Sequence, residues 1–249
     1  MQVDPFKMAI LEPPQDDLLA KIKESELSLQ EGDVVCIASK VVAIHQGRCV
    51  PREGTDKDEL IKKESTQYLD RSEVPGSWVM HTITNNTLCV NAGIDPFAGY
   101  YVLWPEKPEA TAGALLEWFK KEYKLKTLYL VITDSHSVPL RRGVVGTALA
   151  WAGFDPLFDN RATVDLLGHT SGGSQTNVPD SLAAAAVFVM GEQNEQTPLV
   201  RIRNAPYVGT TYTERKKTAT SFEVPMEEDI FAPFLTRAPW KQGGANAQE

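Results

Sequence analysis

The sequence predicts a mixed α/β protein, and three observations support that prediction. Apolar runs of strand length alternate along the chain with segments whose apolar residues recur at helical spacing. No segment repeats another, and no break in composition divides the 249 residues. With 42% hydrophobic residues, the chain can bury one large core or two modest ones. We therefore expect residues 1–236 to form a single module, followed by a flexible tail over residues 237–249.

The N-terminal part of the chain predicts a helix, a strand and a second helix, in that order. Residues 15–25 carry apolar side chains on one face, behind two aspartates that suit a helix N-terminus. DVVCIA, which begins at Asp33, is apolar enough for a buried strand. Residues 56–69 follow as a second, charged helix.

A β-hairpin and a short strand are predicted next. WVMHTIT and TLCV flank Asn85 and Asn86, and asparagine tolerates the positive φ that a two-residue hairpin turn requires. YVLW then gives a short strand. A helix begins near Pro108, because the next apolar residues fall at i, i+3, i+4 and i+7: Ala112, Leu115, Leu116 and Phe119.

The C-terminal half completes the alternation. TLYLVIT is a buried strand, and Pro179-Asp180 opens a helix that runs from Ser181 to Met190. Gly191 is placed to end that helix as a C-terminal cap. PLVRIR supplies the last strand of the core.

Charge and composition exclude several classes of partner. The formal charge of −8 does not favour nucleic acid, although local pockets can still bind small anions. No apolar run approaches the roughly 20 residues of a membrane helix, and the first residues do not resemble a secretion signal, so we expect a cytoplasmic protein with no membrane partner. The three cysteines lack CxxC spacing, which favours structural thiols.

The common nucleotide and zinc motifs are missing from the sequence. There is neither a GxxxxGK[ST] loop nor a GxGxxG turn after the first strand, so a P-loop or Rossmann enzyme is not expected. The four histidines lack HxxxH and HExxH spacing, which argues against a zinc site.

The segment VITDSHSVPLRRG, which begins at Val131, carries the most chemistry. Asp134, Ser135 and His136 are the residue types of a catalytic triad, but adjacent residues on an extended chain point to opposite faces and cannot form one alone. The oxygens of Asp134 and Ser135 suit a hard cation instead. An arginine, Arg141 or Arg142, could face the phosphates that such a cation bridges.

Two further acids lie at the ends of predicted elements. Asp95 ends the NAGID segment after an apolar strand, and Glu192 lies just past a helix end. With Asp134 they could share one or two divalent cations and assist phosphoryl transfer. An aspartate after a strand is also a common turn former or helix cap, and the sequence does not show that the three acids converge.

Several blocks of the sequence resemble the coenzyme F-420:γ-glutamyl ligase family. The similarity is co-linear from about Val3 to Leu235. It is strongest in SKVVAIHQGR, NAGID, ITDS, PLRRGVVGTALAWAGF, DLLG and DSLAAAAVFVMGE. GYYVLWP, VMGE and NEQTPL look more like the bacterial branch, which is described as folate-metabolism γ-glutamate ligases.

The resemblance implies a function and an assembly. It implies a GTP-dependent, or alternatively ATP-dependent, amide ligase that uses Mg²⁺ or Mn²⁺, one or two ions per site. Such an enzyme adds L-glutamate through a γ-glutamyl linkage to a carboxylate acceptor, a deazaflavin coenzyme F-420 precursor or a folate-like molecule, by way of an acyl phosphate. It also implies an α/β fold with mixed sheets that is peculiar to the family, and an intertwined homodimer.

The resemblance also assigns roles to residues. The metal-ligand positions match Asp95, Asp134, Ser135 and Glu192, and the nucleotide-contact positions match Ser39, Lys40, Met190, Gly191, Glu192 and Gln193. Asp134 is a catalytic residue in this assignment. Arg141 is a candidate for phosphate or substrate carboxylate, with a surface ion pair as the alternative. Asp165 could orient a substrate amine or an arginine, with a capping role as the alternative.

Some positions depart from the family pattern. Residues of other types replace two basic residues, two acids and an asparagine that are frequent in the family: Ile44, His169, Gln46, Ser181 and Ala98. These departures keep a second hypothesis open, a catalytically eroded relative that binds a nucleotide or a pterin-like ligand without ligase activity.

Overall fold

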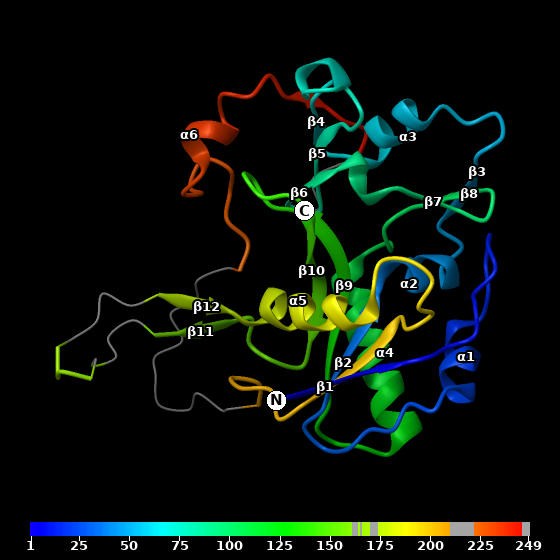
Figure 1. Ribbon diagram of the computed structural model, residues 1–249, viewed down its shortest axis with the longest axis vertical. Helices are drawn as coiled ribbons and strands as arrows, with labels where there is room; N and C mark the ends of the chain where they lie inside the picture. Colours follow the sequence, from blue (N-terminus) through cyan, green and yellow to red (C-terminus); the bar gives the residue numbers. More distant parts are fainter. Residues whose placement is uncertain (161–163, 165, 170–173, 210–221, 246–249) are drawn as a thin grey trace.

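A five-stranded sheet forms the centre of the protein (Figure 1). The computed structural model describes residues 1–160, 164, 166–169, 174–209 and 222–245. The strand order is β1-β13-β2-β9-β10, and only β2 and β9 pair in parallel, so the predicted mixed α/β class is confirmed. The strands are β1 (Gln2–Phe6), β13 (Leu199–Arg203), β2 (Val34–Ala38), β9 (Tyr129–Ser137) and β10 (Val144–Ala152).

Helices cover both faces of this sheet, which explains why its inner strands are apolar without alternation. In β2, Val35 and Ile37 face a core that includes α4 (Pro108–Tyr123), while Val34 and Cys36 face a core that includes α5 (Val178–Met190). On the α4 side the predicted helical stripe is buried, with Phe119 fully inaccessible. The two cores therefore sandwich the sheet and fix the positions of its strand ends.

Two short helices pack into the same core as α4. The helix α1 (Leu18–Glu24) begins at the Asp17 cap, whose carboxylate accepts the N–H groups of Leu19 and Ala20. A second helix, α2 (Ser39–His45), begins immediately after β2 and was not predicted.

Two smaller sheets form the upper part of the view in Figure 1. The first has the order β14-β4-β5-β6, and the second has the order β3-β8-β7. Their strands are β14 (Lys241–Gln242), β4 (Gln67–Tyr68), β5 (His81–Thr84), β6 (Thr87–Val90), β3 (Cys49–Pro51), β8 (Tyr100–Val102) and β7 (Asp95–Phe97). The hairpin β5–β6 is confirmed, with φ of 47° at Asn85 and 51° at Asn86.

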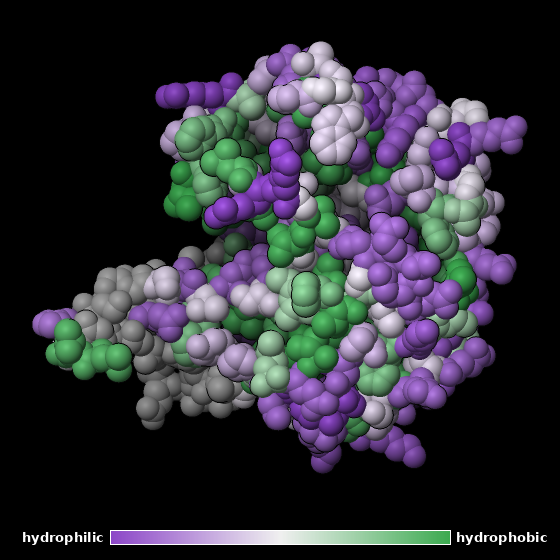
Figure 2. All heavy atoms as spheres, viewed as in Figure 1, coloured by the Kyte–Doolittle hydropathy of each residue, from purple (hydrophilic) through white to green (hydrophobic). Residues whose placement is uncertain are grey.

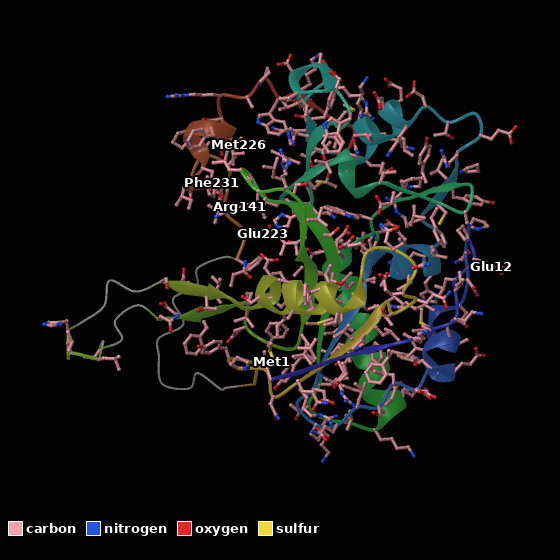
Figure 3. All side chains as sticks on the ribbon, in the orientation of Figure 1. Met1, Glu12, Arg141, Glu223, Met226 and Phe231 are labelled. Carbon is pink, nitrogen blue, oxygen red and sulfur yellow. The ribbon has the colours of Figure 1, made fainter. Side chains whose placement is uncertain are left out.

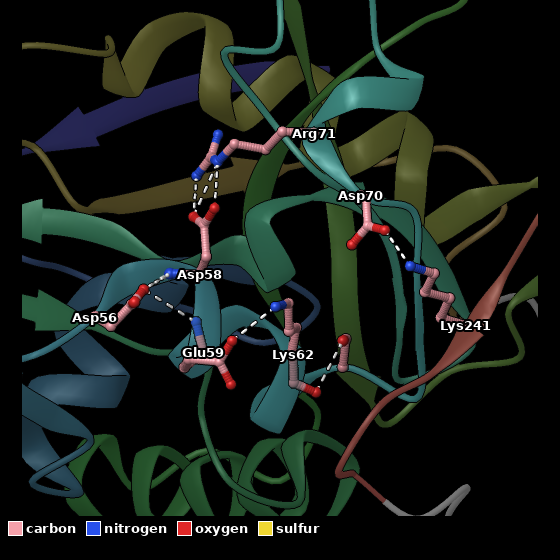
Figure 4. Close-up of polar contacts among 8 residues, drawn as sticks. Asp56, Asp58, Glu59, Lys62, Asp70, Arg71 and Lys241 are labelled. Carbon is pink, nitrogen blue, oxygen red and sulfur yellow. Dashed lines mark hydrogen bonds and ion pairs between the residues drawn. The ribbon is translucent and has the colours of Figure 1, made fainter.

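The second predicted helix is shorter than expected. It forms α3 (Lys57–Glu64), and the expected residues 65–69 instead leave the helix and include β4. Asp56 caps its N-terminus, and Arg71 of the 3₁₀ turn η1 (Arg71–Glu73) binds Asp58 through two guanidinium nitrogens (Figure 4). The charge pattern favoured a continuous helix, but Gln67 and Tyr68 of β4 pair with β5 and form sheet hydrogen bonds instead of helical ones.

The segment from residue 237, which composition predicts to be a flexible tail, makes backbone pairings in the part that the structure describes. The strand β14 pairs with β4, and Lys241 forms an ion pair with Asp70 (Figure 4). The N–H groups of Gly243 and Gly244 donate to Thr66 and Lys62 carbonyls, both at 2.8 Å. Composition misled because the segment is held by main-chain bonds rather than by apolar side chains. Residues 246–249 lie outside the described residues.

Three remaining features complete the described chain. The strands β11 (Leu157–Asp159) and β12 (Gln175–Asn177) form a two-stranded arm at the left of Figure 1. The short helix α6 (Ala232–Leu235) lies above it, and the 3₁₀ turn η2 (Asn91–Gly93) precedes β7. Within the described residues, no helix is long and apolar enough to cross a membrane.

Candidate active site

A cavity of about 360 Å³ opens where β9 passes the ends of β2 and α5. Its wall includes the starts of α2 and β7, the segment from Met8 to Leu11 and the loop that follows α5. The residues that the family pattern assigns to metal and nucleotide all line it: Ser39, Lys40, Asp95, Asp134, Ser135, Met190, Gly191, Glu192 and Gln193. The structure therefore brings together residues that are up to about 150 positions apart in the sequence.

Asp134 lies inside β9, opposite Thr147 of β10, rather than after the strand as the sequence suggested. Its carboxylate accepts the Ser135 N–H at 2.8 Å and the indole N–H of Trp104. Burial, reinforced by the negative charge of Asp95, raises the pKa of Asp134 to about 6. Because Asp134 is within a paired strand, it is neither a turn former nor a helix cap.

The side chains of Asp134 and Ser135 point to opposite faces of the sheet. Asp134 contacts Trp104 of the core on the α4 side, whereas the Ser135 hydroxyl is 3.4 Å from the Glu192 carboxylate beyond α5. This geometry agrees with the argument that adjacent strand residues cannot form a local triad. Both side chains still line the cavity, since it wraps around the end of the sheet.

The NAGID turn allows Trp104 to reach Asp134. Gly93 has a φ of +68°, and a Cβ built on it would lie 2.0 Å from the Trp104 indole nitrogen. Asn91 stabilises the turn by accepting the Met80 N–H at 3.0 Å. Sequence reasoning missed Trp104, although it ends the YVLW strand; its apolar neighbours gave no sign of a polar partner 30 residues away.

Lys40 and Asp95 form an ion pair across the cavity. Their closest atoms, Nζ and Oδ2, are 3.2 Å apart, and both side chains are well exposed, at 41% and 59%. An exposed pair of this kind contributes little to stability, about 1 kcal/mol or less. The ammonium group is therefore available for other partners at low cost.

The loop after α5 holds Glu192 beside Ser135. Met190 is fixed by the Thr197 hydroxyl, which donates to its carbonyl at 2.7 Å. Gly191 has a φ of +76°, and a Cβ there would lie 2.2 Å from the Glu195 carboxyl carbon. Burial, followed by the charge of Asp95, raises the pKa of Glu192.

The donor chemistry fits a hard divalent cation. Asp95, Asp134 and Glu192 offer carboxylate oxygens. Burial and the negative charge of Asp95 raise the pKa values of Asp134 and Glu192, so a cation would relieve an excess of negative charge. Among the described residues, however, no three acid, histidine or cysteine side chains are close enough together to hold a metal ion. The acids share one cavity without forming a preassembled metal site.

The structure does not bring Arg141 to this cavity. Arg141 follows Val138 and Leu140 in the exposed β9–β10 turn, and Figure 3 labels it on the same side of the molecule as Glu223. It is absent from the described residues that line the cavity. Asp165, the other catalytic candidate, lies outside the described residues. The roles of both remain predictions.

The departures from the family pattern lie away from the cavity. Among the described residues, its lining includes none of Ile44, Gln46, Ala98, His169 and Ser181. Ile44 is buried in the core, and the Gln46 amide donates to Thr111 at 2.9 Å and accepts the Glu106 N–H at 2.8 Å. In this chain Ile44 therefore packs in the core, and Gln46 is held by hydrogen bonds to Thr111 and Glu106.

The fold defines an α/β protein whose cavity lies at the end of a central parallel strand pair, the place where such folds commonly bind ligands. Residues 13–204 match the family described as F420-0:γ-glutamyl ligase. The chain belongs to this ligase family, as the sequence blocks predicted.

Individual relatives extend over most of the chain. Coenzyme F420:L-glutamate ligase from Methanopyrus kandleri is 30% identical over 223 residues, which cover 82% of this chain and 86% of that protein. The protein of the same name from Halorubrum lacusprofundi is 32% identical, over 76% of this chain and 81% of its own length. That from Methanothermobacter thermautotrophicus is 29% identical, over 76% and 82%.

Proposed function

We propose that this chain is an amide ligase that joins L-glutamate, through a γ-glutamyl linkage, to a carboxylate acceptor with consumption of GTP or ATP. The observation that carries the proposal is the single cavity shared by Asp95, Asp134, Glu192 and Lys40. The relatives are named for ligation of L-glutamate to coenzyme F420, so a deazaflavin precursor of that coenzyme is the first acceptor to test. A folate-like acceptor is the second.

The proposed reaction has two steps. An oxygen of the acceptor carboxylate attacks the γ-phosphorus, the bond to the β-phosphate oxygen breaks, and an acyl phosphate and a nucleoside diphosphate form. The amine of L-glutamate then attacks the acyl carbon, and inorganic phosphate leaves as the amine loses a proton. Each step therefore accounts for the bond that forms and the group that leaves.

The chain's own groups suit these steps. The Lys40 ammonium can exchange its exposed ion pair with Asp95 for a phosphate oxygen. The loop from Met190 to Gln193 lines the same cavity as Lys40, which supports its proposed contact with the nucleotide. Buried apolar side chains along the wall, including Leu11 and Met190, help to exclude water, which matters because acyl phosphates hydrolyse readily.

Mg²⁺ or Mn²⁺ is part of the proposal. Asp95, Asp134, Ser135 and Glu192 would hold the ion or ions, because they supply hard oxygen donors to one cavity. When bound, the metal neutralises negative charge on the phosphates. The side chains must first close around it, since they are not clustered closely enough in the described structure.

A homodimer is also proposed. Large apolar side chains are exposed near the β9–β10 turn and α6: Leu140, Val144, Ile230, Phe231 and Phe234. Figure 2 shows hydrophobic groups over α6 and at the tip of the β11–β12 arm, where Leu166 and Leu167 lie. Such surfaces typically mark interfaces between proteins.

The test is direct synthesis. Purified protein is incubated with L-glutamate, GTP or ATP, Mn²⁺ and the deazaflavin or folate-like acceptor, and mass spectrometry follows the acceptor. We expect the acceptor to gain the mass of one glutamyl residue or more, and Asp134→Asn to abolish the gain. Nucleotide binding without any mass gain would reject the ligase and support the non-catalytic binding protein. The position of the described departures outside the cavity favours the ligase.

A further inference from the structure

Trp104 contacts one of the proposed metal ligands, although the function proposed above gives it no role. Its indole N–H donates to Oδ2 of Asp134, and the main-chain N–H of Ser135 donates to Oδ1 at 2.8 Å. Hydrogen bonds to a carboxylate are roughly twice as strong as those between neutral groups. Because each carboxylate oxygen accepts a donor, rotation of the group breaks both bonds. The orientation of the Asp134 carboxylate is therefore set by the chain's own groups.

The indole of Trp104 is itself held in place. The side chain is 6% exposed and belongs to the core on the α4 side. Its carbonyl accepts the Nε–H of Arg48 at 3.2 Å, and Arg48 forms an ion pair with Glu64. The backbone of Gly93 passes so close to the indole nitrogen that a side chain at this position would displace the ring. A donor enclosed in this way keeps one orientation, which makes it a precise anchor for a carboxylate.

Trp104 also belongs to the segment that positions Asp95. In the β7–β8 ladder Asp95 pairs with Val102, which lies two residues before Trp104. Along the chain Asp95 follows Gly93, whose backbone approaches the indole, by two residues. The indole thus connects the end of the strand pair that carries Asp95 to β9, which carries Asp134.

We infer that Trp104 is a positioning residue, which holds the Asp134 carboxylate in the orientation that receives a divalent cation. The exposed carboxylates of Asp95 and Glu192 then close around this fixed group. The inference rests on the proposed function, because it takes Asp134 as a metal ligand. Removal of a hydrogen-bond partner of a metal ligand typically lowers metal affinity by about 10- to 100-fold. The indole N–H, rather than the bulk of the ring, is the group that matters.

The hydrogen bond is tested in the metal-free protein, without nucleotide or acceptor. The chain has five tryptophans, so a proton–nitrogen NMR spectrum resolves one indole N–H signal for each. Phenylalanine substitutions at the other tryptophans identify the Trp104 signal by elimination. We expect this signal to move upfield in Asp134→Asn, because a neutral amide oxygen is a weaker acceptor than a carboxylate. A Trp104 signal that is the same in the wild type and in Asp134→Asn overturns the inference.

The consequence is measured by isothermal titration calorimetry with Mn²⁺ alone. Trp104→Phe keeps an aromatic ring and removes the donor, and we expect it to bind Mn²⁺ about ten-fold more weakly than the wild type. Trp118→Phe is the matched control, because Trp118 packs against the same core and is not among the described residues that line the cavity. The same substitution there should leave Mn²⁺ affinity unchanged. Circular dichroism confirms that both variants are folded, and the NMR comparison decides if Trp104→Phe is not.

The outcomes separate this inference from the proposed ligase reaction. Equal Mn²⁺ affinity in the wild type and Trp104→Phe, or an equal loss in Trp118→Phe, overturns the role of Trp104 and leaves the ligase proposal standing. Failure of glutamate transfer to every acceptor, with Mn²⁺ affinity still lowered by Trp104→Phe alone, rejects the ligase and leaves the positioning role standing. A wild-type protein that binds no Mn²⁺ overturns both the proposed metal site and this inference.

Discussion

Gly93 shows how a single missing side chain positions a functional group. Its φ of +68° is strained for any other residue, and a Cβ would lie 2.0 Å from the Trp104 indole nitrogen. We predict that Gly93→Ala lowers the free energy of unfolding by more than about 2 kcal/mol, since the strain of a left-handed residue alone costs roughly 1–2 kcal/mol. It should also displace Trp104 from Asp134 and weaken Mn²⁺ binding, which titration calorimetry would measure.

Gly99 provides the matched control. Its φ is +82°, but nothing lies within 4 Å of a Cβ built on it. Gly99→Ala therefore carries the backbone strain without the contact, and it should cost about 1 kcal/mol in urea unfolding and leave Mn²⁺ affinity unchanged. Equal losses of stability and of Mn²⁺ affinity in the two variants would show that Gly93 does not act through Trp104.

Asp134 should make the stability of the metal-free protein depend on pH. Its folded pKa of about 6 is above the ordinary value of 3.8, so folding favours the protonated form. Stability should fall as pH rises from about 4 to 6 and then level off, by up to roughly 3 kcal/mol. Asp4 and Asp58 act in the opposite direction, because arginine partners lower the pKa of each.

The comparison with Asp134→Asn isolates this contribution. We expect urea unfolding in the presence of a chelator to show that the variant is more stable than the wild type at pH 8, by about 1–3 kcal/mol, and no more stable at pH 4. Asparagine keeps an oxygen that can accept the Trp104 N–H. A wild-type protein that is the more stable of the two at pH 8 would contradict the burial of an unfavourable charge.

Among the secondary-structure elements, β14 makes a definite prediction. Removal of residues 237–249 deletes its pairing with β4 and the hydrogen bonds of Gly243, Gly244 and Ala245. At about 1 kcal/mol for each hydrogen bond, the loss should lower the unfolding free energy by roughly 2–4 kcal/mol. Thermal unfolding of this truncation should be compared with that of a protein lacking only residues 246–249. Equal melting temperatures would restore the frayed-tail interpretation.

The elements that the sequence predicted are those with a strong local signal. The strand β2, the β5–β6 hairpin, α4 and α5 each follow from apolar spacing, a turn dipeptide or a helix cap. The pairing of β14 with β4 joins segments about 170 residues apart, and nothing local marks it. Short strands of two residues exist only through such pairing.

The residues of the candidate site could be predicted where they also had a local signal, but their arrangement in space could not. Asp95, Asp134 and Glu192 could be identified because acids beside apolar elements are unusual. Their convergence depends on the parallel pairing of β2 with β9 and on the direction of α5, which only the tertiary structure fixes. Trp104 was missed because its hydrogen bond to Asp134 joins distant segments of the chain.

At the scale of the whole molecule, the exposed apolar side chains predict self-association. Leu140 is fully exposed, and Phe234 and Ile230 of the α6 region are 76% and 87% exposed. A stable monomer rarely leaves so many large apolar groups in water. Sedimentation velocity should therefore give the wild-type protein twice the 27.5 kDa mass of one chain.

Substitution of the apolar groups tests whether they form the interface. A double variant, Ile230→Glu with Phe234→Glu, places two charges where the partner surface must be desolvated, and it should sediment as a monomer. Trp78→Glu is the control, because Trp78 is 76% exposed but lies on the η1–β5 connection, in a different part of the chain from α6. It changes an exposed apolar side chain to glutamate without touching the proposed interface, so the dimer should persist. A wild-type monomer at micromolar concentration, or a double variant that still dimerises, would mean that this surface does not join two copies of the chain.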